Sequence, residues 1–447
     1  MIPFSESLSV WLRVAAQSFG GPAAQIAVMH RIVVEEKRWV GESRFLHALN
    51  YCMLLPGPEA QQLATYLGWL MHGIPGGLMA GGLFVLPGWL ALQALSMVYV
   101  LWHDVPLVDA LFWGVQAAVL AVIAEAVDRV SKRVLKNGTM RALAVVAFVA
   151  ITALRVPFPI VVLGAGLTGL IGGRVSPAHF MVIRGKEADK EAPGLLDAAL
   201  DAGTLPHVRA SVPRALAIAI VGLTLWLAPV IALRQALGPD DVYARLAAFF
   251  SGAAVVTFGG AYSVLAYVAQ QAVQVYHWLT PDQMTHGLAL AESTPGPLIQ
   301  VVQFVGFLAA ASQPGSLPPL VAGTLGGLLV TWVTYAPSFL WVLLGGPWVE
   351  RLRGIPVLTA ALSAITAAIV GVIASLGVWL VAHVLFTAQM TVSPGGGVVW
   401  TLPNPASFDP IAAVIALAAG AALLRFHVSL GRVLIAAAVV GAAVKLI

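Results

Sequence analysis

Two short stretches rich in proline and glycine decide how this chain folds. Residues 56–58 read Pro56-Gly57-Pro58 and residues 295–297 read Pro295-Gly296-Pro297, each inside a run of apolar residues. Proline cannot donate a backbone hydrogen bond and glycine adopts backbone angles that other residues avoid, so each stretch interrupts a helix. The motif Phe19-Gly20-Gly21-Pro22 interrupts an earlier apolar segment in the same way. The resulting half-helices, of about 14 residues at about 1.5 Å each, are too short to cross a bilayer.

The composition places these interrupted segments in lipid. Hydrophobic residues make up 59% of the 447 positions and charged residues only 10%, whereas roughly 25% of residues are charged in soluble domains. The 44 glycines and 28 prolines indicate broken helices, which are typical of transporters. The single cysteine, Cys52, excludes a disulfide framework and a cysteine-rich metal site. We therefore predict an all-α polytopic membrane protein with broken or re-entrant helices, and residues 1–6 show no start of a cleavable signal peptide.

The chain is a tandem duplication. An offset of 239 residues carries Phe19-Gly20-Gly21 onto Phe258-Gly259-Gly260, and Pro56-Gly57-Pro58 onto Pro295-Gly296-Pro297. The same offset gives three further matches: Trp39 with Trp278, His47 with His286, and Gln61 with Gln300. After an insertion near residues 313–319 the offset becomes 250, as in the match of Pro87 with Pro337. Matches that share one offset indicate two copies of one structural unit.

Lysine and arginine indicate that the two copies face opposite ways, because these residues gather in loops on the cytoplasmic side. The loop at 30–44 holds four basic residues, whereas its counterpart at 269–283 holds none. The bias reverses between the long helices, because residues 102–107 lack Lys and Arg while the second copy carries Arg351 and Arg353. An inverted arrangement with a cytoplasmic N-terminus places 19 of the 24 basic residues inside. We therefore predict two inverted-topology repeats.

These patterns divide the chain into four parts. They are an N-terminal transporter repeat at 1–173, a cytoplasmic linker at 174–214, a connecting transmembrane helix at 215–241 and a C-terminal transporter repeat at 242–447. Inversion requires an odd number of crossings between equivalent loops. That condition is met if residues 5–34 and 42–72, with their copies, re-enter on the side from which they came. We expect the four tips of these hairpins to meet near the middle of the bilayer.

The re-entrant tips are the candidate anion site. A helix that starts after a break has unpaired amides and a positive dipole end, which together bind anions. Glycine permits close approach to the backbone, and proline at a helix start loses no needed donor. The candidate substrate-binding residues are Ser18, Gly20, Gly21, Pro22, Gly57, Pro58, Gln61, Gln62, Thr257, Gly259, Gly260, Gly296, Pro297 and Gln300. Breaks that serve packing alone are the alternative. The glutamines either bind an anion or bridge the halves, and the Ser18 and Thr257 hydroxyls either cap a helix or touch substrate.

Charged residues within the apolar segments are candidates for coupling. Glu59 and Glu292 flank the equivalent breaks of the two copies, and a carboxylate in an apolar cavity can exchange protons, which suits anion efflux coupled to inward proton movement. Glu59 alternatively interacts only with the dipole of the helix that it starts. Arg13 lies within an apolar half-helix and either attracts an anion or extends to the surface. Glu125, close to Arg129, is interpreted as an interfacial residue.

Together these motifs resemble the chromate ion transporter family, in its long, two-domain form. The resemblance rests on 17–22 (QSFGGP), Trp39, 55–64 (LPGPEAQQLA) and 84–87 (FVLP), with Thr257-Phe258-Gly259-Gly260 and Thr294-Pro295-Gly296-Pro297 in the second copy. It covers nearly the whole chain. It implies an inner-membrane exporter of chromate that confers chromate resistance and is driven by the proton gradient as an antiporter. Some members of the family are tied to sulfate, so a sulfate or other oxyanion transporter stays open.

Other function classes are less well supported. A membrane-embedded enzyme or a scaffold is the alternative from a different class, but no nucleophile with a positioned base is evident, so an enzyme is not expected. No phosphate-binding loop, cofactor or metal-ligand cluster is expected either. The expected partners are chromate or a sulfate-like dianion, protons and the lipid bilayer, with no nucleic acid and with a homodimer left open. Glu59 corresponds to Leu298 and Gln62 to Val301, so the site is not expected to be symmetric.

Overall fold

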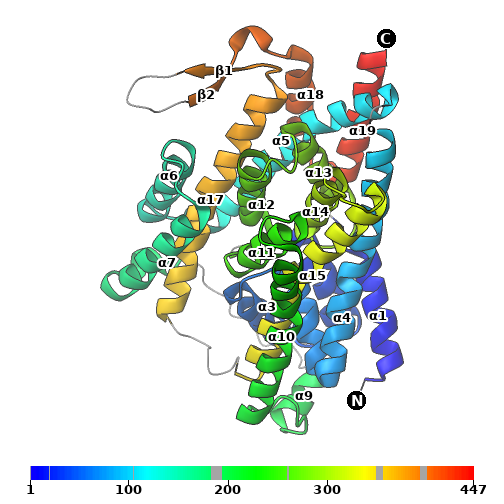
Figure 1. Cartoon of the computed structure of the whole chain (residues 1–447). Helices are drawn as coiled ribbons and strands as arrows, with labels where there is room; N and C mark the ends of the chain where they lie inside the picture. Colours follow the sequence, from blue (N-terminus) through cyan, green and yellow to red (C-terminus); the bar gives the residue numbers. More distant parts are fainter. Residues whose placement is uncertain are drawn as a thin grey trace.

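The structure of the protein is a computed structural model that describes residues 2–19, 21–103, 105–182, 194–258, 261–348, 356–392 and 400–446. Apart from one two-stranded hairpin, the regular secondary structure of these residues is helical (Figure 1). Six of the described helices are long and apolar enough to cross a membrane: Glu59–Trp102, Pro106–Val134, Phe158–Val175, Val212–Leu237, Pro319–Trp348 and Leu358–Val384. The all-α, polytopic membrane fold predicted from the sequence is confirmed.

The first half begins with two broken helical pairs. The pairs are α1 (Phe4–Gln17) with α2 (Gly21–His30), which continues as the π-helical turn η1 (Arg31–Glu36), and α3 (Glu42–Leu54) with α4 (Glu59–Trp102). The breaks coincide with both motifs that interrupt the apolar sequence. A further interruption divides α4, because His72 and Gly73 have non-helical backbone angles. The stretch from Glu59 to this kink is therefore a half-helix, and the rest of α4 is a long helix.

The remaining elements of the first half and the linker follow. They are α5 (Pro106–Val134), α6 (Gly138–Thr152), α7 (Phe158–Val175), α8 (Pro177–Phe180), α9 (Leu195–Asp201) and α10 (Val212–Leu237). The connecting helix predicted at 215–241 corresponds to α10. Only 6% of the most apolar window of α10 is buried inside the protein. Its apolar surface is therefore available to lipid.

The second half repeats the order of broken pairs and long helices. Its elements are α11 (Val242–Val255), α12 (Ala261–Gln270), η2 (Gln271–Val275), α13 (Pro281–Ser293), η3 (Leu298–Gln300), α14 (Val301–Ser312), α15 (Pro319–Gly345), η4 (Gly346–Trp348), α17 (Pro356–Val384), β1 (Gln389–Val392), β2 (Trp400–Pro403), η5 (Pro405–Ser407), α18 (Pro410–Gly420), η6 (Ala421–Arg425) and α19 (Leu430–Leu446). The second proline–glycine–proline motif separates α13 from η3, as its copy separates α3 from α4.

Each half supplies a helical pair that packs on the other half. α6 and α7 pack along α17, and α18 and α19 pack along α5 (Figure 1). Small residues let these helices approach closely. A Cβ at Gly114 in α5 would lie 2.1 Å from the carbonyl oxygen of Ala437 in α19, and one at Gly371 in α17 would lie 2.0 Å from that of Ala144 in α6. The two halves are interlocked.

The two ends of the molecule carry different elements. The N-terminus and α9 lie at the lower end of Figure 1, and the C-terminus, α18 and the β1–β2 hairpin lie at the upper end. The linker helix α9 is held on the first half, because the Leu196 amide donates to the Trp39 carbonyl at 2.9 Å and the Asp197 carboxylate pairs with Arg44 at 2.8 Å. The linker thus covers the loop between the two broken pairs of the first half.

Candidate functional site

The tips of the broken pairs meet across the two halves. The Gly57 amide donates to the Thr257 carbonyl at 2.8 Å, and the Gly296 amide donates to the Ser18 carbonyl at 2.9 Å. The offset of 239 residues that relates the two copies also relates these two hydrogen bonds, since it pairs Gly57 with Gly296 and Ser18 with Thr257. Each half therefore places one tip carbonyl and one tip amide against the other half.

Backbone geometry explains why glycine occupies the two proline–glycine–proline tips. Gly57 has a φ of +129° and Gly296 a φ of +93°, in the region that side chains rarely adopt. The tips also approach the long helices closely. A Cβ at Gly88 in α4 would lie 2.4 Å from the Pro295 carbonyl oxygen, and a Cβ at Gly57 would lie 3.2 Å from Oγ of Ser338 in α15. Each tip thus rests on a long helix of the opposite half.

The helices that start after these tips offer unpaired amides. In α4 the first helical hydrogen bond runs from the Gln62 amide to the Pro58 carbonyl, so the amides of residues 59–61 have no acceptor within the helix. In η3 the Gln300 amide donates to Pro297 at 2.8 Å, which leaves residues 298 and 299 in the same position. Neither helix start is capped by a side-chain hydrogen bond. Both starts can therefore stabilise an anion through amides and dipole.

The predicted glutamines are buried and form hydrogen bonds within the protein. The Gln61 amide oxygen accepts from Ser338 Oγ at 2.6 Å, which links α4 to α15 of the other half. The Gln300 side chain donates to Gln303 at 2.8 Å, and Gln62 donates to a carbonyl in its own tip. The Oε1 atoms of Gln62 and Gln300 accept no hydrogen bond from the described part of the chain. These two amides keep unused hydrogen-bonding capacity beside the tips.

The hydroxyls of Ser18 and Thr257 form hydrogen bonds with carbonyls of their own helices. Ser18 Oγ donates to the Val14 carbonyl and Thr257 Oγ1 to the Ala253 carbonyl, both at 2.7 Å. Each hydroxyl therefore satisfies a carbonyl in the last turn before a break, while the carbonyl of the same residue accepts from a tip of the other half. Both side chains are fully buried.

The charged candidates lie in different surroundings. Glu292 is buried, and its Oε1 accepts from the Tyr262 hydroxyl at 2.7 Å. Glu59 is the first residue of α4 and is partly buried. Arg13 lies on an exposed face, where it pairs with Glu36 at 2.7 Å. Its charge is therefore engaged at the surface.

A buried glutamine that the sequence did not single out also contacts a tip. Gln25 in α2 is buried and donates to the Gly296 carbonyl at 2.5 Å. Its signal in the sequence is a polar residue one turn after a break in an apolar segment. Gly21 and Pro22 start α2, with Gly21 at a φ of +79°. The remaining tip candidates lie outside the described residues: Gly20, Gly259 and Gly260.

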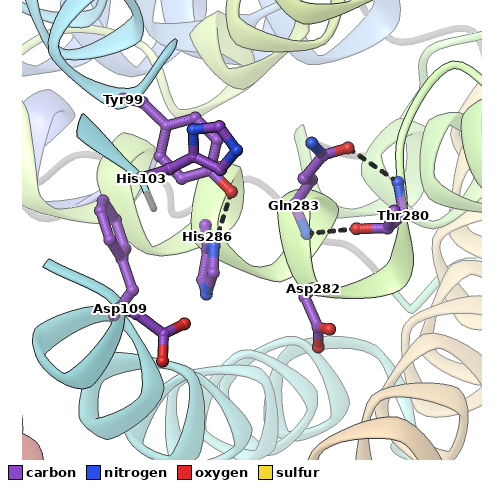
Figure 2. A pocket seen from close by; sticks show the side chains of 8 residues that line it. Tyr99, His103, Asp109, Thr280, Asp282, Gln283 and His286 are labelled. Carbon is purple, nitrogen blue, oxygen red and sulfur yellow. Dashed lines mark hydrogen bonds between the residues drawn. The ribbon is translucent and has the colours of Figure 1, made fainter. Parts of the chain in front are cut away.

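A polar pocket lies where α4 ends and α5 and α13 begin (Figure 2). Its volume is about 190 Å³, and Asp109, Asp282 and His286 are among the side chains that line it. A hydrogen bond of 3.0 Å joins the Tyr99 hydroxyl to Nδ1 of His286. Thr280 closes a capping box with Gln283 at the start of α13. Among the described residues, no group of three or more His, Cys, Asp or Glu is placed to hold a metal ion.

The fold and the tips define a class: a multi-pass membrane protein whose centre is built from broken helices. The chain belongs to the family described as Chromate transporter, which matches residues 6–170 and 244–442. A "Chromate transport protein" of Pseudomonas aeruginosa is 32% identical, covering 81% of this chain and 77% of the relative. One of Cupriavidus metallidurans is 28% identical, covering 81% and 79%. No solved structure matches the chain. The family resemblance drawn from the sequence is confirmed.

Proposed function

We propose that the protein is a secondary active transporter that exports chromate across the bacterial inner membrane, coupled to protons as an antiporter, and thereby confers chromate resistance. The observation that carries this proposal is the reciprocal contact of the tips, Gly57 with Thr257 and Gly296 with Ser18. Membership of the family and relatives named as chromate transport proteins support the choice of substrate.

The contact between the tips suggests how the site works. In this conformation the amides of Gly57 and Gly296 are donated to carbonyls of the opposite half. When the tips part, both amides become available to a tetrahedral dianion, beside the uncapped starts of α4 and η3. Two inverted halves that move about a central site are the basis of alternating access. The substrate therefore replaces one half of the protein as the acceptor for the other half.

The orientation follows from charge. The first-half loops rich in Lys and Arg and the linker lie inside, with the N-terminus cytoplasmic. The carboxylates of Glu59 and Glu292, at equivalent breaks, exchange the protons that move inward. The pocket beside His286 then belongs to the outer face, because residues 102–107 and 269–283 carry no Lys or Arg.

The test of this proposal is chromate accumulation in cells. Cells that express the protein should accumulate less chromate than cells with an empty vector, and a protonophore should abolish the difference. In inside-out vesicles whose lumen has been acidified by respiration, added chromate should dissipate part of the proton gradient. Accumulation equal to that of empty cells contradicts export.

Binding measured on the purified protein then identifies the substrate. We expect chromate to bind more tightly than sulfate or molybdate. Tighter binding of sulfate makes the protein a sulfate transporter of the same fold. Light scattering on the same sample determines whether the protein is a homodimer.

A further inference from the structure

Three side-chain amides and a hydroxyl form a row of hydrogen bonds between the two halves. Gln300, beside the second proline–glycine–proline tip, donates to Oε1 of Gln303 in α14 at 2.8 Å. Gln303 donates to Oε1 of Gln93 in α4 at 2.9 Å, and Gln93 donates to Oγ1 of Thr324 in α15 at 3.0 Å. These four residues form an amide row from the tip, through α4 of the first half, to the second turn of α15.

The amide row runs from the buried tip into less buried surroundings. Gln300 and Gln303 are 1% and 0% exposed, Gln93 is 7% exposed, and Thr324 is only partly buried. The row lies where α4 packs against both α14 and α15 (Figure 1). In the proposed orientation the start of α15 faces the outside, because the basic residues that follow its end lie inside. The row therefore leads from the tip towards the outer face.

The equivalent positions of the other copy are apolar. They are Ala64 for Gln303, Leu343 for Gln93 and Ile74 for Thr324. The packing agrees with this alignment, since a Cβ at Gly327 would lie 3.4 Å from Oε1 of Gln93, and a Cβ at the equivalent Gly77 would lie 3.2 Å from Cδ2 of Leu343. Contact between the halves is thus made without amides at the equivalent place, so packing alone does not require the row.

The amide row offers what an oxyanion needs inside a membrane. Each side-chain amide carries two hydrogens, and Gln93 has one acceptor, Thr324, in the described part of the chain. The buried indole N–H of Trp89, whose carbonyl accepts from Gln303 at 3.2 Å, has no acceptor among the described residues. Polar side chains at membrane depth mark the paths of ions and substrates. Neutral donors also hold a dianion less firmly than an arginine does, which suits release.

We propose that the oxyanion leaves for the outer face along the amide row, between α4 and the α14–α15 pair, with the amides of Gln303 and Gln93 as successive donors. The proposal rests on the proposed function, because it assigns the release path of the exported oxyanion. In this conformation the amides donate to each other and to Thr324, and the path is closed. When the halves part, the oxyanion replaces these acceptors. The apolar counterparts in the other copy offer no side-chain donor, which restricts this kind of path to one face.

The first test is thiol labelling of the full-length protein on a Cys52→Ser background. In Gln303→Cys, a sulfonate-bearing methanethiosulfonate that does not cross membranes should react in right-side-out vesicles and not in inside-out vesicles. Chromate at about three times its dissociation constant should slow the reaction about fourfold, because a bound oxyanion occupies the row. Ala64→Cys is the matched control, since both positions are 0% exposed, and it should not react from the outer side.

The labelling overturns the proposal in three cases. They are no reaction of Gln303→Cys from the outer side, reaction from the inner side alone, and equal outer reaction of Gln303→Cys and Ala64→Cys. Each would show that the amide row does not open to the outside.

The second test is chromate uptake into inside-out vesicles, which measures export. Gln93→Leu places at this position the residue found at Leu343, and we expect a wild-type melting temperature with export about tenfold slower, the loss expected for one hydrogen bond to an ion. Gln93→Asn keeps an amide and should recover part of the rate. Leu343→Met changes little volume and is the control, with a change of less than about twofold. If the row only joined helices, Gln93→Leu would lower the melting temperature and leave the rate per folded protein unchanged, and that result overturns the proposal.

The outcomes separate this proposal from the function on which it rests. A wild type that transports no oxyanion removes the proposed function and this proposal with it. A wild type that exports chromate, with Gln303→Cys unreactive from the outer side, removes only the path.

Discussion

At the tips, backbone geometry restricts which residue type can occupy a position. Gly57 and Gly296 have positive φ, and a Cβ at Gly296 would lie 3.1 Å from the Cα of Gly88. We expect Gly57→Leu and Gly296→Leu to abolish chromate export, because a left-handed conformation costs roughly 1–2 kcal/mol for other residues and the side chain separates the tip from its helix. Chromate accumulation in cells measures the effect. Gly252→Leu, which has nothing within 4 Å of its Cβ position, should keep export. Full activity in both tip variants refutes the site.

Glu59 distinguishes proton exchange from helix stabilisation. It is the first residue of α4, whose N-terminus has no side-chain cap. We expect Glu59→Gln to reduce the dependence of export on external pH while the protein level changes little, because the amide cannot exchange a proton. A residue that only interacts with the dipole would contribute about 0.3–1 kcal/mol to stability and leave that dependence intact. Export rates across external pH, normalised to protein level, decide between these roles.

The sequence predicted the helix breaks but not the partners of the residues at them. A shared offset shows that Gly57 and Gly296 are equivalent, yet it does not show that each bonds a carbonyl of the other copy. Arg129 also has a partner that the sequence could not show, for a different reason. It belongs to a run of five basic residues at 129–141, which indicates membrane orientation. Only the packing of α5 near α12 brings its guanidinium to Tyr262. For Arg13 the sequence left anion attraction and extension to the surface both open, and the structure places it on an exposed face.

At the scale of elements, the described end of the linker, residues 194–214, packs against the first half of the chain. The Asp197 carboxylate accepts from the Gly41 amide at 2.9 Å and is 8% exposed. The His207 ring lies edge-on to Trp69, and its Nε2 is 3.2 Å from the Leu70 carbonyl. From sequence this stretch was interpreted only as a cytoplasmic linker, because its mixed charges are typical of a solvated segment. The docking depends on contacts between segments distant in the sequence, which composition does not encode.

The docking of the linker should depend on pH through His207. Burial lowers the pKa of His207 from its ordinary value of 6.5, so the docked state favours the neutral ring. The docking free energy is therefore greatest above that value and falls as the pH drops through it towards the lowered pKa, where the free linker takes up a proton first. Hydrogen exchange of the amides of residues 203–205, 207 and 208 measures this loss as exchange at acid pH that is faster than the intrinsic rate predicts. His207→Gln should remove the dependence, and a flat profile in the wild type contradicts it.

At the scale of the whole molecule, the halves exchange helical pairs. Hydropathy and repeat matching predicted spans and two copies, and the long apolar helices are present. Neither signal could show that α6 and α7 pack on α17 while α18 and α19 pack on α5. The length of an apolar segment alone indicates that it crosses the membrane. Which helices then pack together depends on small residues, whose close approach exists only in the folded chain. Because Gly57 bonds Thr257 and Gly296 bonds Ser18, a relative movement of the two halves would break both tip contacts.

Relative movement of the halves can be tested by crosslinking, since the chain has a single cysteine, buried Cys52. On a Cys52→Ser background, cysteines at Gln93 and Thr324 replace a 3.0 Å hydrogen bond between α4 and α15, which belong to opposite halves. We expect a short thiol crosslinker that a reductant can cleave to stop export in vesicles, and the reductant to restore it, because alternating access requires the halves to shift. Cysteines at Ser7 and Met71, whose side chains lie 3.8 Å apart within the first half, form the matched control and should export whether crosslinked or not. Export at the uncrosslinked rate from the fully linked α4–α15 pair would exclude this movement as the transport step.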